Sequence, residues 1–359
     1  MELLQFFNLD IEPTNRCNAK CSFCPRDQTP HQGLMTQATF DQAMVRALEF
    51  RTVARERFDR DMKVNLCGLG EPLLNTLTPG FVHQIRSLGL ECSVSSNAAL
   101  LDERRGAELL DAGLQAIEIN VGDVDEQYEE IYQLPFERTR DNILRFKEMA
   151  EGRCNVRIVL VDHRRDPVHT AAVSDYWRSH GIDQFFPFKI MNRAGALQVD
   201  SMQYDGSPDQ AEAAEILRDA QVRPICAVPF VFLFVGYDGQ YYLCCSDWKK
   251  EVPLGSVFDA SFVEVTEAKL RHVTTRRPIC HACNHDPVNS IADELGAVRE
   301  GLTSELEKDI HVQTLIGYAK VVDVLVKAQV DPASDAEISA LPSGPDTSGR
   351  RPLIPIRSN

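Results

Sequence analysis

Three cysteines near the start of the chain, Cys17, Cys21 and Cys24, follow the spacing Cys-x3-Cys-x2-Cys. Three thiolates on one short loop can ligate three irons of a cubane [4Fe–4S] cluster and leave the fourth iron open to a small molecule. A structural zinc site is the alternative, but it needs a fourth Cys or His, and this spacing is not a usual zinc pattern. The loop therefore predicts a cluster with an open iron, which suits an enzyme better than an electron carrier.

A second set of cysteines lies in the C-terminal half of the chain. It consists of Cys226, Cys244, Cys280 and Cys283. Four thiolates would complete the ligation of one further [4Fe–4S] cluster. A zinc ribbon is the alternative, because four Cys also suit zinc. Cys245 adjoins Cys244 and is a second candidate for the same ligand position.

Short β-branched runs alternate with longer amphipathic stretches in the first half of the chain. This alternation indicates βαβ crossovers and a parallel sheet. The expected strands are Phe7–Glu12, Lys63–Leu66, Glu91–Ser95, Ala116–Val121, Asn155–Val161 and Gln184–Met191, and the expected helices are Thr39–Phe50, Thr78–Leu88, Asp102–Asp111, Thr139–Glu151 and Val168–His180. Six strands are too few for a closed eight-stranded barrel, so we expect an open (βα)6 barrel with its active site at the carboxyl ends of the strands.

The chain changes character after residue 200. A helix is expected at Pro208–Ala220, a hairpin between Pro229–Val235 and Gln240–Cys244, and further helices at Phe262–Thr274 and Thr303–Gln329. The Asp238-Gly239 dipeptide between two apolar runs is a strong hairpin signal. We therefore expect an α/β fold with four parts: a barrel at 1–205, a small hairpin and helix domain for the second cluster at 206–300, a helical segment at 301–330 and a disordered tail at 331–359.

The composition fits an intracellular enzyme. The chain has 359 residues and a formal net charge of −15, which argues against nucleic acid or an anionic membrane as the main partner. It has no run of 18 apolar residues that would span a membrane, and its first residues lack the pattern of a signal peptide. Eleven cysteines in so long a chain indicate metal or redox sites rather than disulfides. We expect a cytoplasmic protein.

The first cysteine motif, with the aromatic Phe23 before Cys24, resembles the radical S-adenosylmethionine (SAM) superfamily. The second set resembles the twitch domain, a shortened relative of the SPASM domain, and is most like that of the 2-deoxy-scyllo-inosamine dehydrogenases, which oxidise a cyclitol alcohol. The Gly-x4-Cys spacing from Gly239 favours Cys244 over Cys245 as ligand in such a module. The resemblance implies two [4Fe–4S] clusters, one that binds SAM and one auxiliary.

The resemblance also implies where SAM would be held. The segment Gly68-Leu69-Gly70-Glu71-Pro72 is similar to the family's Gly-Gly-Glu-Pro motif, whose exposed carbonyls accept the SAM ammonium group. The other positions that match places for SAM in the family are Phe23, Ser95, Ser96, Asn97 and Asn120. Each polar residue at a strand end is also explained by local capping. Arg193, in a segment that resembles a family Asn-x-Ala-Gly motif, is a candidate to clamp a substrate or SAM carboxylate.

The activity implied by the resemblance begins with electron transfer from a flavodoxin- or ferredoxin-type donor and cleavage of SAM to a 5′-deoxyadenosyl radical. That radical takes a hydrogen atom from a small-molecule substrate. Loss of an electron to the auxiliary cluster would oxidise a carbinol of a sugar- or cyclitol-like natural-product intermediate. Hydrogen return from a thiol, with Cys245 as the candidate donor, would instead give an epimer.

Two further functions stay open from the sequence. One is a peptide maturase, although the cluster loop begins directly after the first strand and leaves no room for the peptide-recognition domain that such enzymes often carry before it. The other is a non-catalytic protein, either an Fe–S electron carrier or a zinc-ribbon scaffold. Neither form of the non-catalytic protein explains the Gly68–Pro72 segment or the repeated βα units.

Overall fold

The computed structural model describes residues 8–29, 31–58, 61–164, 166–197, 207–274 and 278–330. The chain forms two compact units. One, here called the sheet unit, comprises Phe6–Ile190 and Phe232–Val265; the other, the helical unit, comprises Met191–Val231 and the chain from Thr266 onward. The two units interleave along the chain, since the second segment of the sheet unit follows the first segment of the helical unit. The proposed boundaries at residues 205, 300 and 330 stay predictions.

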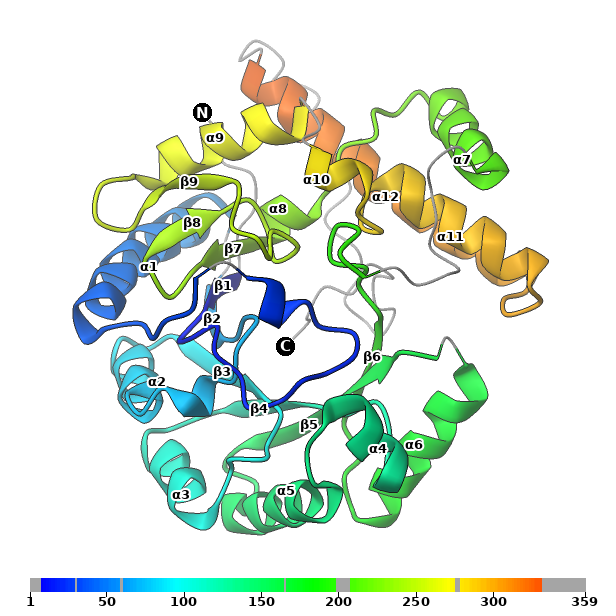
Figure 1. The fold of residues 1–359 in the computed structure, drawn as a ribbon. Coiled ribbons are helices and arrows are strands. Elements are labelled where there is room, and N and C mark those ends of the chain that lie inside the picture. Colours follow the sequence, from blue (N-terminus) through cyan, green and yellow to red (C-terminus); the bar gives the residue numbers. More distant parts are fainter. Residues whose placement is uncertain are drawn as a thin grey trace. The chain divides into compact units, whose positions relative to one another are not determined.

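The sheet unit contains one nine-stranded sheet in the order β6-β5-β4-β3-β2-β1-β7-β8-β9. Its strands are β1 (Asn8–Ile11), β2 (Lys63–Leu66), β3 (Glu91–Ser96), β4 (Ala116–Asn120), β5 (Asn155–Asp162), β6 (Phe185–Lys189), β7 (Phe232–Val235), β8 (Gln240–Tyr242) and β9 (Pro253–Ser256). Strands β1 to β7 pair in parallel, whereas β8 and β9 are antiparallel additions. Figure 1 shows β1 to β6 as an open arc, which confirms the predicted α/β class and the unclosed barrel.

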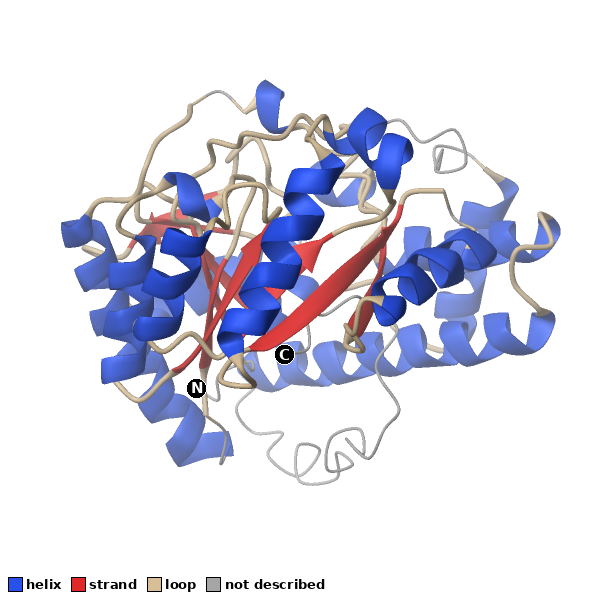
Figure 2. Ribbon diagram, turned by 90° about the horizontal axis from the view of Figure 1, so that it is seen from below, coloured by secondary structure: helices blue, strands red, loops and turns tan. Residues whose placement is uncertain are grey.

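Helices cover the outer side of this arc (Figures 1 and 2). They are α1 (Gln37–Phe58), α2 (Thr78–Ser87), α3 (Glu103–Asp111), α4 (Asp125–Tyr132), α5 (Phe136–Ala150) and α6 (Pro167–Ser179), with short 3-10 turns η1 (Arg26–Gln28) and η2 (Pro72–Leu74). Side chains fix several helix starts. The carboxylate of Asp102 accepts from Arg105 N at 2.9 Å, and that of Asp166 accepts from Val168 N at 2.9 Å. Such N-caps satisfy amides that have no partner within the helix.

The core of the sheet unit is apolar. Strand residues such as Val64, Val94 and Ile117 have no solvent exposure. Phe40 of α1 stacks on Phe81 of α2 with ring centroids 4.0 Å apart. Each such side chain contributes about 1.5–3 kcal/mol when it is fully buried. This core holds the strands in register, so the loops at their carboxyl ends start from fixed positions.

The helical unit is built mainly from α7 (Pro208–Asp219), α11 (Pro287–Arg299) and α12 (Glu305–Val330), with short helices α8 (Val228–Val231) and α10 (Pro278–His281). Helix α11 packs against both α7 and α12. Gln210 Nε2 of α7 donates to Asn289 Oδ1 of α11 at 3.0 Å, and His311 Nδ1 of α12 lies 2.8 Å from Glu294 Oε2 of α11. Helix α9 (Phe262–Thr274) spans the boundary between the two units.

The structure corrects several details of the sequence-based expectation. The apolar run Pro229–Val235 is a strand only from Phe232, since α8 occupies its start. Helices α4 and α11 and strand β9 were not expected. The predicted hairpin turn is present: Gly239 has φ +79°, and Gly236 N donates to Gln240 O at 2.9 Å. The tail 331–359 lies outside the described residues. Among the residues described, no helix is both long and apolar enough to cross a membrane.

Candidate active site

The loop between β1 and α1 brings its cysteines together. Cys17, Cys21 and Cys24 are all half-buried. Burial raises the pKa of Cys17 to about 11, and the nearby charges of Glu71 and Cys24 add to that rise. Burial followed by the charges of Cys24 and Cys17 also raises the pKa of Cys21. Mutual effects of this kind require neighbouring thiols. Iron would have to displace their protons, because the thiolate is the metal ligand.

Helix α4, which was not predicted, anchors this loop. Lys20 N donates to Tyr132 O at 3.2 Å, and Ser22 N donates to Ile131 O at 3.0 Å, so the last carbonyls of α4 accept the loop's amides. The ring of Phe23 meets that of Tyr132 edge to face, with centroids 5.4 Å apart. The sequence Asp125–Tyr132 is short and acidic, which explains why its helical period was not visible. The dark blue loop after β1 in Figure 1 runs inside the arc of strands.

The Gly68–Pro72 loop lies against the cysteine loop, and its glycines permit this contact. A Cβ on Gly70 would lie only 2.1 Å from Thr14 O, and a Cβ on Gly68 would lie 2.6 Å from Glu12 Cγ. Glu71 N donates to Arg16 O at 2.8 Å. The two loops therefore form one backbone-to-backbone support next to Cys17.

Glu71 is buried and organises the end of β3. Its carboxylate accepts from Leu73 N at 3.0 Å, from Ser96 Oγ at 2.8 Å and from Asn97 N at 2.8 Å. Burial raises the pKa of Glu71, although these donors oppose the rise. Both carboxylate oxygens thus have protein partners, and Glu71 fixes Ser96 and Asn97 in place. A direct contact between Glu71 and SAM stays a prediction.

The polar residues at the ends of β3 and β4 lie at the same edge of the sheet. Asn97 Nδ2 donates to Asn18 Oδ1 at 2.9 Å and reaches Cys17 Sγ at 3.7 Å. Asn120 Nδ2 donates to Ser95 Oγ at 3.2 Å. Asn97 therefore lies next to Cys17, whereas Ser95 and Asn120 contact each other at the same edge of the sheet. Their roles toward SAM stay predictions.

Three of the four cysteines of the second set lie together in the helical unit. Cys226 Sγ contacts His285 O at 3.3 Å, and His285 N donates to Cys283 Sγ at 3.4 Å. Burial raises the pKa of Cys226, with further contributions from Cys283 and Cys280. Cys244 and Cys245 belong to the sheet unit, in the turn after β8. Which of the two completes the ligation stays a prediction.

Arg193 lies in a strained turn of the helical unit. Arg193, Ala194 and Gly195 all have positive φ, at +49°, +53° and +83°. Asn192 Nδ2 donates to Ala282 O at 2.6 Å, and Asn284 N donates to Asn192 Oδ1 at 3.1 Å. The turn is thereby fastened to the segment that carries Cys280 and Cys283. A contact between Arg193 and a carboxylate stays a prediction.

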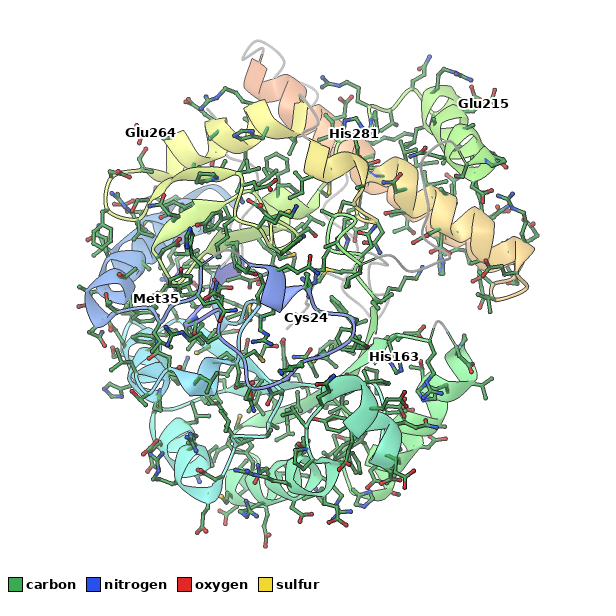
Figure 3. The ribbon with its side chains drawn as sticks, viewed as in Figure 1. Cys24, Met35, His163, Glu215, Glu264 and His281 are labelled. Atoms are coloured by element: carbon green, nitrogen blue, oxygen red, sulfur yellow. The ribbon has the colours of Figure 1, made fainter. Side chains whose placement is uncertain are left out.

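Sequence reasoning missed a charged cluster at the ends of β4 and β5. Asp123, which is 1% exposed, has Arg164 Nη2 at 2.7 Å, His169 Nε2 at 3.2 Å and His163 Nε2 at 3.4 Å from its Oδ2. The available signal was positional: Asp123 lies three residues after the end of β4 and His163 directly after β5, at the edge where the site was expected. Figure 3 labels His163 and Cys24, both within the arc of strands.

A second missed contact joins β1 to the turn after β8. Lys250 Nζ lies 2.8 Å from Glu12 Oε2, and both side chains are buried, at 8% and 0% exposure. Glu12 Oε1 accepts from Leu69 N at 3.1 Å. Lys250 Nζ also lies 4.3 Å from the centroid of the Tyr242 ring. This ion pair connects the turn that carries Cys244 with the Gly68–Pro72 loop.

These donor sets fit the implied cofactors. Cys17, Cys21 and Cys24 share one loop with buried polar residues beside it, and their thiolates would hold three irons of a cluster with one open iron. Cys226, Cys280 and Cys283 would supply three thiolates to a second cluster; the fourth ligand, Cys244 or Cys245, stays a prediction.

Comparison with known proteins found similar sequences and similar folds. The chain is 30% identical over 132 residues to a probable GTP 3′,8-cyclase of Methanococcus maripaludis strain C7. That match covers 36% of this chain, and the chain spans only 40% of the length of that relative. The fold is similar to that of Streptococcus suis SuiB bound to precursor peptide SuiA, at 14% identity and a TM-score of 0.57, over 79% of this chain and 71% of that one. BtrN in complex with AdoMet and 2-DOIA aligns at 17% identity and a TM-score of 0.47, over 78% of this chain and 93% of that one.

Family models match both cysteine regions. Residues 11–169 match the model of the radical SAM superfamily, and residues 226–284 match SPASM, an iron–sulfur cluster-binding domain. The first match contains the cysteine loop, the Gly68–Pro72 loop and the ends of β3 and β4; the second contains all the cysteines of the second set. These domains use SAM and two [4Fe–4S] clusters. The chain therefore carries a radical SAM domain at residues 11–169, followed by a SPASM domain at residues 226–284.

Proposed function

We propose that this enzyme oxidises a carbinol carbon of a sugar- or cyclitol-like intermediate to a ketone. The observation that carries the proposal is the cysteine count of the SPASM domain. Residues 226–284 contain Cys226, Cys244, Cys245, Cys280 and Cys283, enough to ligate one auxiliary cluster completely and too few for two. A cluster with four protein ligands has no open iron for substrate, so an electron-accepting role suits it best.

When bound, SAM and its cluster would supply hydrogen-atom abstraction, and the auxiliary cluster would supply an electron acceptor. The chain's own residues would position these groups. Glu71 fixes Ser96 and Asn97 beside Cys17, and the glycines at 68 and 70 let their loop pack closely against the chain at Glu12 and Thr14. We propose a small-molecule substrate and a flavodoxin- or ferredoxin-type reductant.

One alternative outcome is epimerisation. Cys245 stands next to the favoured ligand Cys244, so a thiol would be available at this position to return hydrogen to a substrate radical. An epimerase would need no electron acceptor. Peptide modification is the other alternative, and it would require a precursor peptide as substrate.

The test uses the full-length protein, reconstituted and reduced without oxygen in D2O. The probes are 2-deoxy-scyllo-inosamine as an aminocyclitol, and GTP because of the partial likeness to a GTP cyclase. A ketone two mass units lighter than the aminocyclitol supports the proposal. A product with unchanged connectivity and one carbon-bound deuterium, lost in Cys245→Ala, would establish epimerisation instead. Conversion of GTP with no change in the aminocyclitol would also overturn the proposal.

A further inference from the structure

The charged cluster of Asp123 with His163, Arg164 and His169 has no role in the function proposed above. Asp123 and His163 follow β4 and β5 at the carboxyl edge of the sheet. His169 lies on the first turn of α6, and Arg164 follows His163 directly. The cysteine loop reaches this cluster through Phe23, whose ring is stacked at 25° to that of His163 with centroids 6.4 Å apart. The cluster therefore lies beside the loop that carries the first cysteine triplet.

The contacts of His163 define the state of its ring. Nδ1 lies 3.3 Å from Val161 O, and a carbonyl only accepts, so this contact favours the tautomer with its hydrogen on Nδ1. Nε2 then has a lone pair, which accepts from Arg164 Nε at 3.3 Å. Asp123 Oδ2 lies 3.4 Å from the same Nε2. A proton that arrives at Nε2 would therefore be held against a carboxylate.

The packing around His163 keeps this arrangement rigid. A Cβ on Gly122 would lie 2.3 Å from Val161 O and 3.1 Å from both His163 Nδ1 and the Tyr132 hydroxyl, so only glycine fits there. Asp123 Oδ1 accepts from Val124 N at 2.9 Å, which fixes the carboxylate. The charged and titratable groups that face His163 are Asp123, Arg164 and His169, and Tyr132 packs beside it.

We propose that His163 is the proton acceptor of the reaction, with Asp123 as the residue that positions and stabilises its protonated ring. This assignment rests on the proposed dehydrogenation. The substrate hydroxyl would replace Arg164 Nε at His163 Nε2. Only the Nε contact of Arg164 would have to give way, because its Nη2 is held separately by Asp123 Oδ2 at 2.7 Å and Gln127 Oε1 at 2.8 Å, and its side chain is 38% exposed.

The atoms and electrons of this step balance. The carbinol C–H bond breaks and its hydrogen atom goes to the 5′-deoxyadenosyl group. The O–H bond breaks and its proton goes to His163 Nε2. The auxiliary [4Fe–4S] cluster would be the oxidant that takes the remaining electron, and the carbon–oxygen bond would become a carbonyl. Removal of the proton matters because an ionised ketyl gives up its electron far more readily than its protonated form.

The charge state of His163 agrees with this role. Burial lowers the pKa of His163, and the positive charges of Arg164 and His169 also lower it, while Val161 O and Asp123 oppose them. The ring is therefore neutral at pH 7 and able to accept a proton. Ketone formation should rise with pH through the pKa of His163 and then level off.

The test compares variants in the reconstituted full-length protein with SAM, reductant and 2-deoxy-scyllo-inosamine that carries deuterium on its carbinol carbon. In His163→Gln, ketone should fall about 100-fold, the usual size of a general-base contribution. Formation of deuterated 5′-deoxyadenosine should stay within about threefold of wild type, because hydrogen abstraction precedes proton loss. His180→Gln is the matched control, since His180 lies at the far end of α6 and contacts Tyr176 O at 2.9 Å. It should change neither product.

The variant Asp123→Asn tests whether Asp123 acts on the protonation of His163 or only stabilises the fold. Loss of the carboxylate should lower ketone formation about tenfold and move the acid limb of its pH profile to lower pH. Equal losses of ketone and 5′-deoxyadenosine in His163→Gln, or an unmoved acid limb in Asp123→Asn, would overturn the assignment. A wild-type protein that makes no ketone from this probe overturns the proposed dehydrogenation, and with it this assignment, before any variant is compared.

Discussion

The side-chain amide of Asn97 donates a hydrogen bond to the sulfur of Cys17, with Nδ2 and Sγ 3.7 Å apart. The orientation of this amide is fixed at both ends. Its Oδ1 accepts from Ala99 N at 3.0 Å, and its Nδ2 also donates to Asn18 Oδ1 at 2.9 Å. Hydrogen bonds to ligand sulfurs raise the potential of an iron–sulfur cluster, because they stabilise its more negative reduced state.

Asn97→Ala should therefore make the SAM-binding cluster harder to reduce. A hydrogen bond of about 1.4 kcal/mol corresponds to a tenfold change in the reduction equilibrium, or about 59 mV for a one-electron couple. Potentiometry followed by electron paramagnetic resonance, with SAM omitted, measures the shift. Asn120→Ala is the control, since Asn120 contacts Ser95 at the same edge. Equal potentials in wild type and Asn97→Ala would show that the amide does not act on the cluster.

The glycines at 70 and 80 form a matched pair. A Cβ at Gly70 would meet the backbone of Thr14 at 2.1 Å, whereas a Cβ at Gly80, within α2, would meet nothing within 4 Å. Gly70→Ala should abolish SAM cleavage, because the loop must move away from Cys17. Gly80→Ala should keep full activity and gain about 0.5–1 kcal/mol of stability, as is usual inside a helix. Active Gly70→Ala protein would refute the close packing of the two loops.

The buried Glu12–Lys250 pair gives a prediction for stability. Lys250→Met leaves the Glu12 carboxylate buried without its cation, which should destabilise the protein by about 3–5 kcal/mol. The double variant Glu12→Gln/Lys250→Met should recover part of this loss. Lys249→Met, on a lysine that is 53% exposed, should change stability by less than about 1 kcal/mol. Thermal unfolding followed by circular dichroism measures these variants together with Glu12→Gln, and additive effects of Glu12→Gln and Lys250→Met in the double variant would contradict the coupling.

The auxiliary ligand set is tested by two neighbouring substitutions. Cys244→Ala should lose the iron of one cluster, whereas Cys245→Ala should retain the iron of both. Iron and sulfide analysis of protein prepared without oxygen gives the answer. The reverse result would identify Cys245 as the ligand and remove it as a candidate hydrogen donor.

The first cysteine triplet should account for half of the iron. The triple variant Cys17→Ala/Cys21→Ala/Cys24→Ala should retain about half of the wild-type iron and sulfide, because the auxiliary cluster keeps its own ligands. Zinc content is measured in the same samples. Retention of all or none of the iron would contradict two independent clusters.

Most of the parallel strands and the helices between them could be predicted from the sequence, because short β-branched runs alternate clearly with longer amphipathic stretches. The cysteine triplet and the Gly68–Pro72 loop could be found for the same reason: their residue types are unusual and their spacing is local. Helix α4 could not be found, since its eight residues are mostly polar and its role comes from carbonyls that accept from Lys20 and Ser22. The Asp123–His163 contact joins residues 40 positions apart, and no local period encodes such a pairing.

The second cysteine set could likewise be predicted only in part from the sequence. Its spacing predicted one auxiliary cluster, and the SPASM match agrees. The contacts of Cys226 with the segment at 280–285 depend on how α8 and α10 pack, which the spacing does not contain. The Glu12–Lys250 pair is a further example, because each residue alone is an ordinary charged side chain in the sequence.

The most direct test of the account is formation of 5′-deoxyadenosine by the reconstituted, reduced protein with SAM. The account predicts 5′-deoxyadenosine and methionine in equal amounts from wild type, and none from the Cys17/Cys21/Cys24 triple alanine variant. No 5′-deoxyadenosine from wild-type protein under a strong reductant, although iron and sulfide match two intact clusters, would contradict radical SAM chemistry in this chain.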